Sequence, residues 1–267
     1  VISAGENADL QPDVIAYNAV ISAGEKAGLW ARALRLLARM SRQEVQPTVI
    51  TYNSAISACE KGGQWIQAFG LLLEMRRRDL DADTITYNAL ISACERCEQW
   101  ERALALASEM CSSGPDPSIV SFNAATSACA GAAQWQQGLV LMMTALHRGL
   151  VPDIITFNSA ISATGNGGRW ERAELLLEGM MRADIDPSIV SYNAALCAVS
   201  SQVRLLHNVG NLLLKQLNPG KVMDGKGGDE WRRAQTFLRS MRQRHLEPDT
   251  IAYAVTTGAH ERAGDAV

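Results

Sequence analysis

Apolar and small residues recur along this chain at the spacing of a helix, in short segments separated by breaks. From Tyr17 the pattern follows i, i+3, i+4, i+7, and it stops before Gly28. The same spacing resumes at Trp30 and runs to Met40. The positions are Tyr17, Val20, Ile21 and Gly24 in the first segment, and Trp30, Ala33, Leu34, Leu37 and Met40 in the second. The pattern predicts two short amphipathic helices with a break at Gly28.

This two-helix pattern repeats with a period of 35 residues. An aromatic residue followed by Asn marks each unit, at Tyr17-Asn18, Tyr52-Asn53, Tyr87-Asn88, Phe122-Asn123, Phe157-Asn158 and Tyr192-Asn193. Trp keeps the same step at Trp30, Trp65, Trp100, Trp135 and Trp170, and the units close at Pro47, Ala82, Pro117, Pro152, Pro187 and Pro248. Trp231 follows Trp170 by 61 residues, one period plus 26, so the sixth unit carries an insertion.

The length of the segments determines how such units must fold. A helix of about 12 residues is marginal in water by itself. A two-helix unit leaves one apolar face uncovered, so neighbouring units must stack and share a continuous core. The period therefore predicts an all-α solenoid of helix-turn-helix repeats.

At the level of the repeated unit the resemblance becomes specific. The 35-residue unit at 49–83 reads VITYNSAISACEKGGQWIQAFGLLLEMRRRDLDAD, and it resembles the pentatricopeptide repeat family of the plain P type. The resemblance implies a right-handed superhelix related to tetratricopeptide arrays. We expect repeats at 14–48, 49–83, 84–118, 119–153, 154–188 and 189–249, the last with an insertion at about 201–229. Residues 1–13 are expected to be the remnant of a preceding repeat, and residues 250–267 a partial repeat.

The resemblance implies that the array binds single-stranded RNA, one base per repeat. Base choice in the family is attributed to the Asn of the first helix together with the last residue of the repeat. The pairs are Asn18 with Thr48, Asn53 with Asp83, Asn88 with Ser118, Asn123 with Asp153, Asn158 with Ser188, and Asn193 with Asp249. Matching them to the family's pattern, from the RNA 5′ end, gives the pyrimidine tract Y-U-C-U-C-U.

The residue types fit this assignment, although the last residues of the repeats also have a structural explanation. Asn is an indifferent helix former and lies off the apolar stripe, whereas its amide can donate and accept at the edge of a base. The last residues stand just before a helix, where Asp, Ser and Thr are the preferred N-caps, so capping alone would explain them.

Two further sets of side chains match family positions. The apolar residues three places before each Asn would clamp the base between repeats, with core packing as the equal alternative: Ile15, Ile50, Ile85, Val120, Ile155 and Val190. Three cations near the end of the first helix would contact phosphates, with solvated helix ends as the alternative: Lys26, Lys61 and Arg96.

Composition narrows the classes of partner. With 47% hydrophobic and 20% charged residues the chain has the composition of a folded protein. Its longest apolar stretch, around 139–146, is far shorter than the about 20 residues of a membrane-spanning helix, so we expect no membrane partner. The net charge of −3 argues against indiscriminate binding to a polyanion. Six Cys and no visible leader fit a reducing compartment, although the chain starts at Val1 and a targeting segment could lie upstream.

Chemistry-bearing clusters are not apparent. Cys94 and Cys97 form a lone C-x-x-C pair, and Cys59, Cys94 and Cys129 share one phase of the repeat, which predicts helix packing rather than metal binding. We expect no catalytic residue, no metal and no cofactor. In the insertion, 203–214 could form an extra helix and 218–229 a flexible tether, either as a protein-binding element or as a loop without a role.

The sequence thus predicts a monomeric, non-catalytic binder of single-stranded RNA that acts in organellar RNA processing, stability or translation. By resemblance the compartment is a mitochondrion or chloroplast. Two alternatives stay open: a protein-protein interaction scaffold like the tetratricopeptide arrays, and the RNA-binding fragment of a longer processing enzyme.

Overall fold

The computed structural model describes residues 13–199 and 227–264, and over these residues it contains helices and turns but no strand. The first helices of the repeats are α1 (Val14–Lys26), α3 (Val49–Lys61), α5 (Thr84–Arg96), α7 (Ile119–Gly131), α9 (Ile154–Asn166) and α13 (Thr250–Gly264). Residues 189–199 are also helical. The second helices are α2 (Trp30–Arg42), α4 (Trp65–Arg77), α6 (Trp100–Ser112), α8 (Trp135–His147), α10 (Trp170–Arg182) and α12 (Gly227–Gln243).

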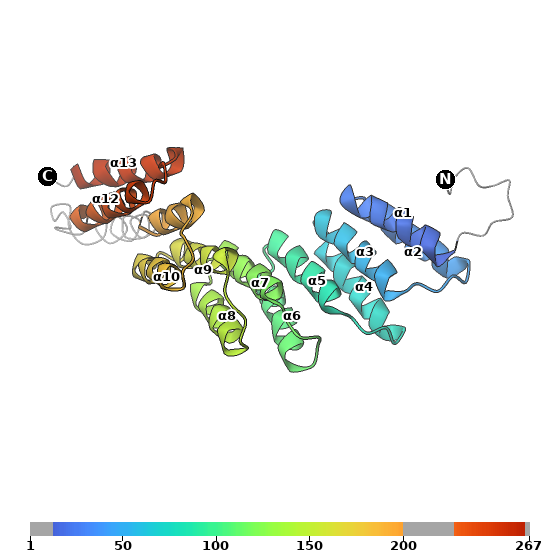
Figure 1. The fold of residues 1–267 in the computed structure, drawn as a ribbon. Coiled ribbons are helices and arrows are strands. Elements are labelled where there is room, and N and C mark those ends of the chain that lie inside the picture. The colour runs from blue at the N-terminus through green and yellow to red at the C-terminus, as the bar shows by residue number, and fades with distance from the viewer. Residues whose placement is uncertain (1–12, 200–226, 265–267) are drawn as a thin grey trace, which may run out of the picture. The chain divides into compact units, whose positions relative to one another are not determined.

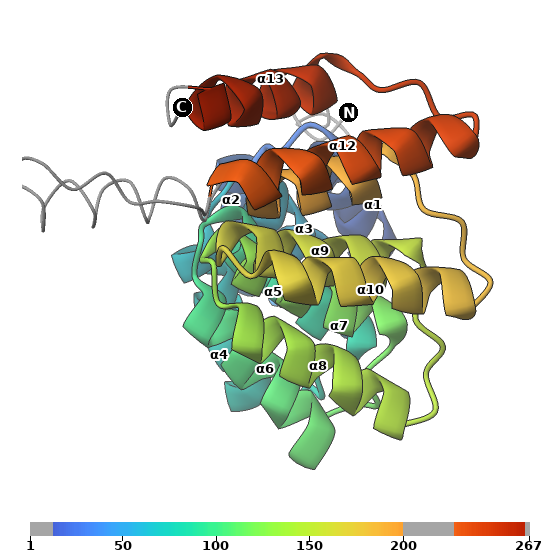
Figure 2. The same cartoon turned by 90° about the vertical axis from the view of Figure 1, so that its left-hand side faces the viewer.

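The helices pack as repeats within two compact units, residues 1–128 and 129–267. In the first unit α1, α3 and α5 lie side by side, and α2 and α4 each contact both their own first helix and that of the next repeat (Figure 1). In the second unit α9 contacts α8 and α10, and α12 packs on α13 (Figure 2). The predicted fold class, an all-α solenoid of helix-turn-helix repeats, is confirmed.

The turn inside each repeat contains a residue in the left-handed region. Gly63 has φ 65° between α3 and α4, and the following Gln64 N–H donates to Cys59 O at 2.8 Å, closing the helix end. Glu98 and Ala133 take the same position at φ 57° and 55°, a conformation that costs a residue with Cβ about 1 kcal/mol. The regular turn therefore follows from the repeat and not from glycine alone.

The core is built from small and apolar residues at fixed repeat positions. The aromatic residue before each Asn is buried, as are an Ala and a Met seven residues apart in α2, α4, α6, α10 and α12. Cys59, Cys94 and Cys129 are fully buried, and burial raises the pKa of each thiol to about 11. These cysteines are packing residues, as their shared phase predicts.

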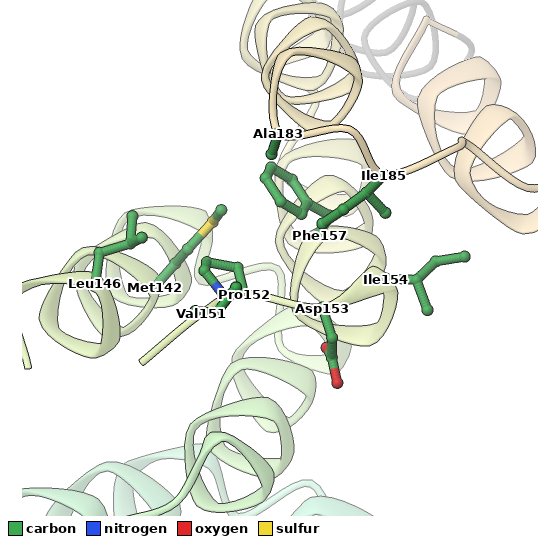
Figure 3. A pocket seen from close by; sticks show the side chains of 9 residues that line it. All are labelled: Met142, Leu146, Val151, Pro152, Asp153, Ile154, Phe157, Ala183 and Ile185. Carbon is green, nitrogen blue, oxygen red and sulfur yellow. The ribbon is translucent and has the colours of Figure 1, made fainter. Parts of the chain in front are cut away.

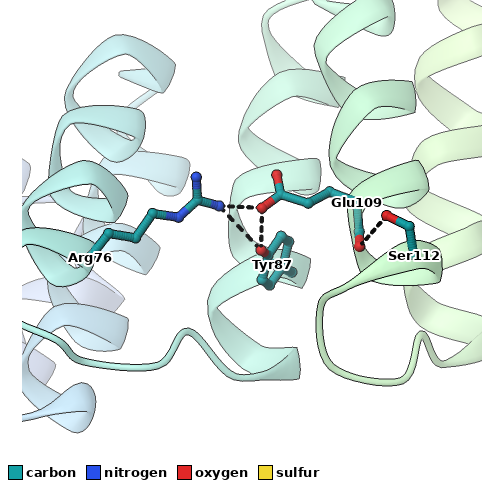
Figure 4. A network of polar contacts seen from close by, with 4 residues as sticks. All are labelled: Arg76, Tyr87, Glu109 and Ser112. Carbon is teal, nitrogen blue, oxygen red and sulfur yellow. Dashed lines mark hydrogen bonds and ion pairs between the residues drawn. The ribbon is translucent and has the colours of Figure 1, made fainter.

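Tyr residues of the first helices also connect the two helices of a repeat. The Tyr52 hydroxyl donates to Glu74 Oε1 at 3.0 Å, and the Tyr87 hydroxyl donates to Glu109 Oε1 at 2.8 Å. Arg76 of the preceding repeat reaches both partners of the second pair, so the network joins two repeats (Figure 4). The tyrosines therefore fix the register of one helix against the other.

The contact between the first-helix Tyr and the second helix also shows the length of the insertion in the sixth repeat. Tyr52 and Glu74 are 22 residues apart, whereas the Tyr192 hydroxyl meets Ser240 Oγ at 2.8 Å across 48 residues. Arg233 lies 3.4 Å from the ring centroid of Trp170, so α12 packs on the fifth repeat as an ordinary second helix. The frame that Trp231 predicts is therefore resumed after the insertion.

The described part of the insertion differs from expectation at its end. Residues 227–229, predicted to belong to a flexible tether, form the first turn of α12. The predicted extra helix, the rest of the tether, and residues 1–12 of the predicted remnant at 1–13 lie outside the described residues. Within the described ranges, no helix combines the length and apolar character needed to cross a bilayer.

Candidate nucleic-acid interface

The six Asn residues occupy one position, near the start of the first helix of each repeat. Five of them are half-buried, and Asn123 is 6% exposed. The Asn side chains are therefore partly covered, although they lie off the apolar stripe of their helices. The Asn row comprises Asn18, Asn53, Asn88, Asn123, Asn158 and Asn193.

A hydroxyl from the next repeat holds the amide oxygen of Asn18, Asn53, Asn88 and Asn158. Thr86 Oγ1 donates to Asn53 Oδ1 at 2.5 Å, and Ser121 Oγ donates to Asn88 Oδ1 at 2.5 Å. The same bond joins Thr51 to Asn18 at 2.6 Å and Ser191 to Asn158 at 2.6 Å. These hydroxyl residues were not predicted as site residues, because the sequence shows only a position that varies among Ser, Thr and Ala.

The last residues of the repeats cap helices, as predicted. Asp83 Oδ1 accepts from Thr86 N at 2.8 Å and Asp249 Oδ1 accepts from Ala252 N at 2.9 Å. Ser118 and Ser188 accept the equivalent backbone bond at 3.4 Å. Capping the next helix is therefore one role of the last residue of the repeat.

In the second and sixth repeats the capping residue binds its Asn. Asn53 Nδ2 lies 3.1 Å from each carboxylate oxygen of Asp83, and Asn193 Nδ2 donates to Asp249 Oδ2 at 2.8 Å. Where the last residue is Ser, the link is indirect: Ser118 Oγ lies 3.2 Å from Ser121 Oγ, which in turn bonds Asn88. The predicted pairs Asn53–Asp83 and Asn193–Asp249 are thus brought into direct contact.

These bonds favour the charged form of the Asp83 carboxyl. Burial opposes its ionisation, but hydrogen bonds from the Thr86 backbone and hydroxyl and from Asn53 outweigh burial and lower the pKa of Asp83 below its usual value. At neutral pH the carboxylate is therefore charged and accepts hydrogen bonds only.

The apolar residues three places before each Asn are not core residues. Their exposed fractions run from 56% for Ile155 to 76% for Ile15. One turn separates each from its Asn, so both lie on the same helix face. Ile251 of the partial repeat, 53% exposed, continues the row and was not predicted. The apolar row comprises Ile15, Ile50, Ile85, Val120, Ile155, Val190 and Ile251.

Two of the predicted phosphate ligands are engaged in ion pairs. Lys61 Nζ lies 2.9 Å from Glu25 Oε1, and Arg96 Nε lies 3.0 Å from Glu60 Oε1. Each pair joins the ends of two consecutive first helices. Lys26 is exposed at the end of α1. The three cations therefore lie at the C-terminal ends of α1, α3 and α5, and two of them already neutralise carboxylates.

A separate apolar hollow of about 520 Å³ lies in the second unit. Met142, Pro152, Phe157 and Ile185 converge on it, and Asp153 supplies its one polar side chain (Figure 3). Such a lining offers few hydrogen bonds to the edge of a base, so the candidate site is the Asn row. Over the described residues no group of three or more potential metal ligands is found.

Family models match most of the array. The model described as the PPR repeat family matches residues 12–61, 47–94 and 82–131, and the pentatricopeptide repeat domain model matches 140–201. The chain belongs to the pentatricopeptide repeat family. No curated protein matches the chain significantly.

Solved structures of this family share the fold. The crystal structure of the pentatricopeptide repeat protein PPR10 from maize aligns with a TM-score of 0.57 and 23% identity, over 94% of this chain and 37% of that chain. The structure of PPR10 in complex with an 18-nt psaJ RNA element aligns with a TM-score of 0.52 and 26% identity, over 96% and 42%. The chain thus spans well under half the length of these proteins.

Proposed function

We propose that this chain binds single-stranded RNA along the Asn row, one base per repeat, with a preference for a pyrimidine tract. The observation that carries the proposal is the coincidence, repeat after repeat, of a hydrogen-bonded Asn with an exposed aliphatic side chain one turn away on the same helix face. An aliphatic side chain can cover the face of a base while an amide contacts its edge. The PPR10 structure solved with an 18-nt RNA element supports this assignment.

The preferred tract follows from the last residue of each repeat. A carboxylate such as Asp83 or Asp249 accepts hydrogen bonds only, which suits the N3–H of uracil, whereas the hydroxyl of Ser118 or Ser188 can donate to the N3 of cytosine. With the N-terminal repeat at the RNA 5′ end, the proposed order is Y-U-C-U-C-U. The protein would act by occupying a transcript in a mitochondrion or chloroplast, to affect its processing, stability or translation, without a reaction of its own.

The experiment is a selection from randomised RNA at two salt concentrations, followed by binding of a fluorescein-labelled RNA that carries UUCUCU between oligo-A flanks. We expect UUCUCU to bind better than oligo-A of equal length, and Asn158→Ala to lose discrimination at the fifth base. Asn166→Ala is the matched control on the same helix, because Asn166 lies outside the Asn row and donates to Ala130 O at 2.8 Å. Equal binding of UUCUCU and oligo-A would refute the proposal.

A second candidate function, a protein-interaction scaffold, has one observation in its favour. Helix α8 exposes three apolar side chains, Val140, Met143 and Leu146, at 59%, 51% and 41%. Exposed apolar groups of this kind mark protein contacts in other molecules. This function would be favoured if the protein bound no RNA but bound a protein partner, and if Val140→Asp abolished the binding to that partner.

A further inference from the structure

The hydroxyls that donate to Asn18, Asn53, Asn88 and Asn158 come from the neighbouring repeat, whereas in the sixth repeat no described residue supplies such a donor for Asn193. Thr51, Thr86, Ser121 and Ser191 each donate to the Asn of the repeat before. The seventh unit has Ala252 at this position. Asn193 Oδ1 is buried and has no hydrogen-bond partner among the described residues.

The hydroxyl fixes the orientation of the amide. Thr86 Oγ1 accepts from Asp83 N at 3.2 Å, so its single proton is left to donate. The contact with Asn53 Oδ1, at 2.5 Å, is shorter than the contact with Asp83 Oδ1, at 2.9 Å. With its oxygen held, the Asn53 amide turns Nδ2 toward Asp83, and since an amide nitrogen carries two protons, one N–H remains for a base.

We propose that the third residue of each first helix is a positioning residue for the base contact of the preceding repeat. Base selection at one repeat then depends on three side chains: its own Asn, its own last residue, and the hydroxyl of the next repeat. This inference rests on the proposed RNA binding and adds a determinant that lies outside the repeat whose base it governs.

The chain contains a natural comparison. The second and sixth repeats carry the same pair, Asn53 with Asp83 and Asn193 with Asp249, and both pairs are in contact. They differ in the hydroxyl, which Thr86 supplies and Ala252 lacks. The wild-type protein should therefore select uracil more strongly at the second base than at the sixth.

Two substitutions at Thr86 and one at Ala252 test the inference in opposite directions. Thr86→Val keeps the shape of the side chain and removes the hydroxyl, so discrimination between UUCUCU and UACUCU should fall by roughly 2- to 12-fold, the range of one net hydrogen bond. Thr86→Ser should restore it, because Ser occupies this position at Ser121 and Ser191. Ala252→Ser should raise discrimination between UUCUCU and UUCUCA by a similar factor.

The controls separate positioning from stability. Thr86→Val should leave discrimination at the fifth base, measured with UUCUAU, unchanged, whereas a general loss of folding would lower it too. Thr164→Val removes a buried hydroxyl that donates to Ile161 O of its own helix at 2.8 Å, and it should leave selection at every base unchanged. Independently of RNA, Ala252→Ser should raise the urea midpoint of unfolding, since it gives a buried acceptor its donor.

The outcomes distinguish the inference from the function on which it rests. Suppose that the wild-type protein discriminates between the RNA probes. If Thr86→Val then discriminates equally well at the second base, or loses discrimination equally at the second and fifth bases, the inference is wrong and the proposed function stands. No effect of Ala252→Ser on either the sixth base or the urea midpoint would also overturn it. A wild-type protein that discriminates at no base would overturn the proposed function and the inference together.

Discussion

Two isoleucines on α5 allow an effect on RNA affinity to be separated from an effect on stability, because one lies in the apolar row and the other in the core. Ile85 is 62% exposed, whereas Ile91 is 0% exposed. Replacing Ile85 by Ala removes three carbons, each worth about 0.8 kcal/mol when fully buried. Roughly two fifths of the side chain is buried in the free protein, so its removal should lower the free energy of unfolding by about 1 kcal/mol. The higher helix propensity of Ala reduces this loss to about 0.5 kcal/mol.

The exposed part of Ile85 is what a base could cover. If RNA covers it fully, Ile85→Ala should weaken binding by about 1.5 kcal/mol, or roughly 12-fold. Ile91→Val is the matched control: it removes one buried methylene, costs about 0.5–1.5 kcal/mol in unfolding free energy, and should leave RNA affinity unchanged. The two variants therefore have comparable stability and different affinity.

The assay is fluorescence anisotropy with the UUCUCU probe, together with urea unfolding of the same preparations. The argument fails if Ile85→Ala binds like the wild-type protein, because the apolar row would then not face the RNA. It also fails if Ile85→Ala destabilises the fold by more than about 2 kcal/mol, since that loss requires a side chain in the core.

Three further predictions concern polar contacts. Asp83→Ser should keep the helix cap and shift the preference at the second base from uracil toward cytosine in competition binding. Because folding lowers the pKa of Asp83, its carboxylate stabilises the wild-type protein above the unfolded pKa, and this contribution is lost as pH falls through the folded pKa. Acid titrations of the variant should not show that loss of stability. Tyr52→Phe should lower the urea-unfolding free energy by about 1–2 kcal/mol by removing the bond to Glu74, with RNA affinity unchanged; no loss of stability would show that water replaces this bond fully. Glu25→Gln should release Lys61, raise RNA affinity at low salt, and steepen the plot of log affinity against log salt by up to about 0.7; an unchanged slope would mean that Lys61 contacts no phosphate.

The sequence predicts the helices well because their signals are local and repeated. Trp30 and Trp65 begin second helices where the apolar period resumes, and Val49 begins a first helix directly after its Thr48 cap. The repeat period alone indicates the insertion and its length, since Trp231 lies one period plus 26 residues after Trp170. Local periodicity therefore determines the order and the approximate bounds of the elements.

The site was harder to predict because its decisive contacts join different repeats. Ile50 follows Val49, and periodicity did not show which of two adjacent β-branched residues faces the core. The partners Glu25 and Lys61 are one period plus one residue apart, a relation that becomes visible only when helices are stacked. The sequence does not indicate Thr86 as a site residue, because its partner Asn53 lies 33 residues earlier, in another repeat.

The last residue of each repeat caps a helix and, in the proposed function, also selects a base, and this would limit what the array can select. It must cap the next helix, which restricts it to side chains that accept from a backbone N–H, and all six positions are Asp, Ser or Thr: Thr48, Asp83, Ser118, Asp153, Ser188 and Asp249. Exchange among these residues keeps the cap and changes the hydrogen bonds offered beside the Asn. The proposed preference can therefore change between uracil and cytosine at little cost in stability, whereas a bulky side chain without an acceptor would lose about 1 kcal/mol at the cap whatever base it favoured.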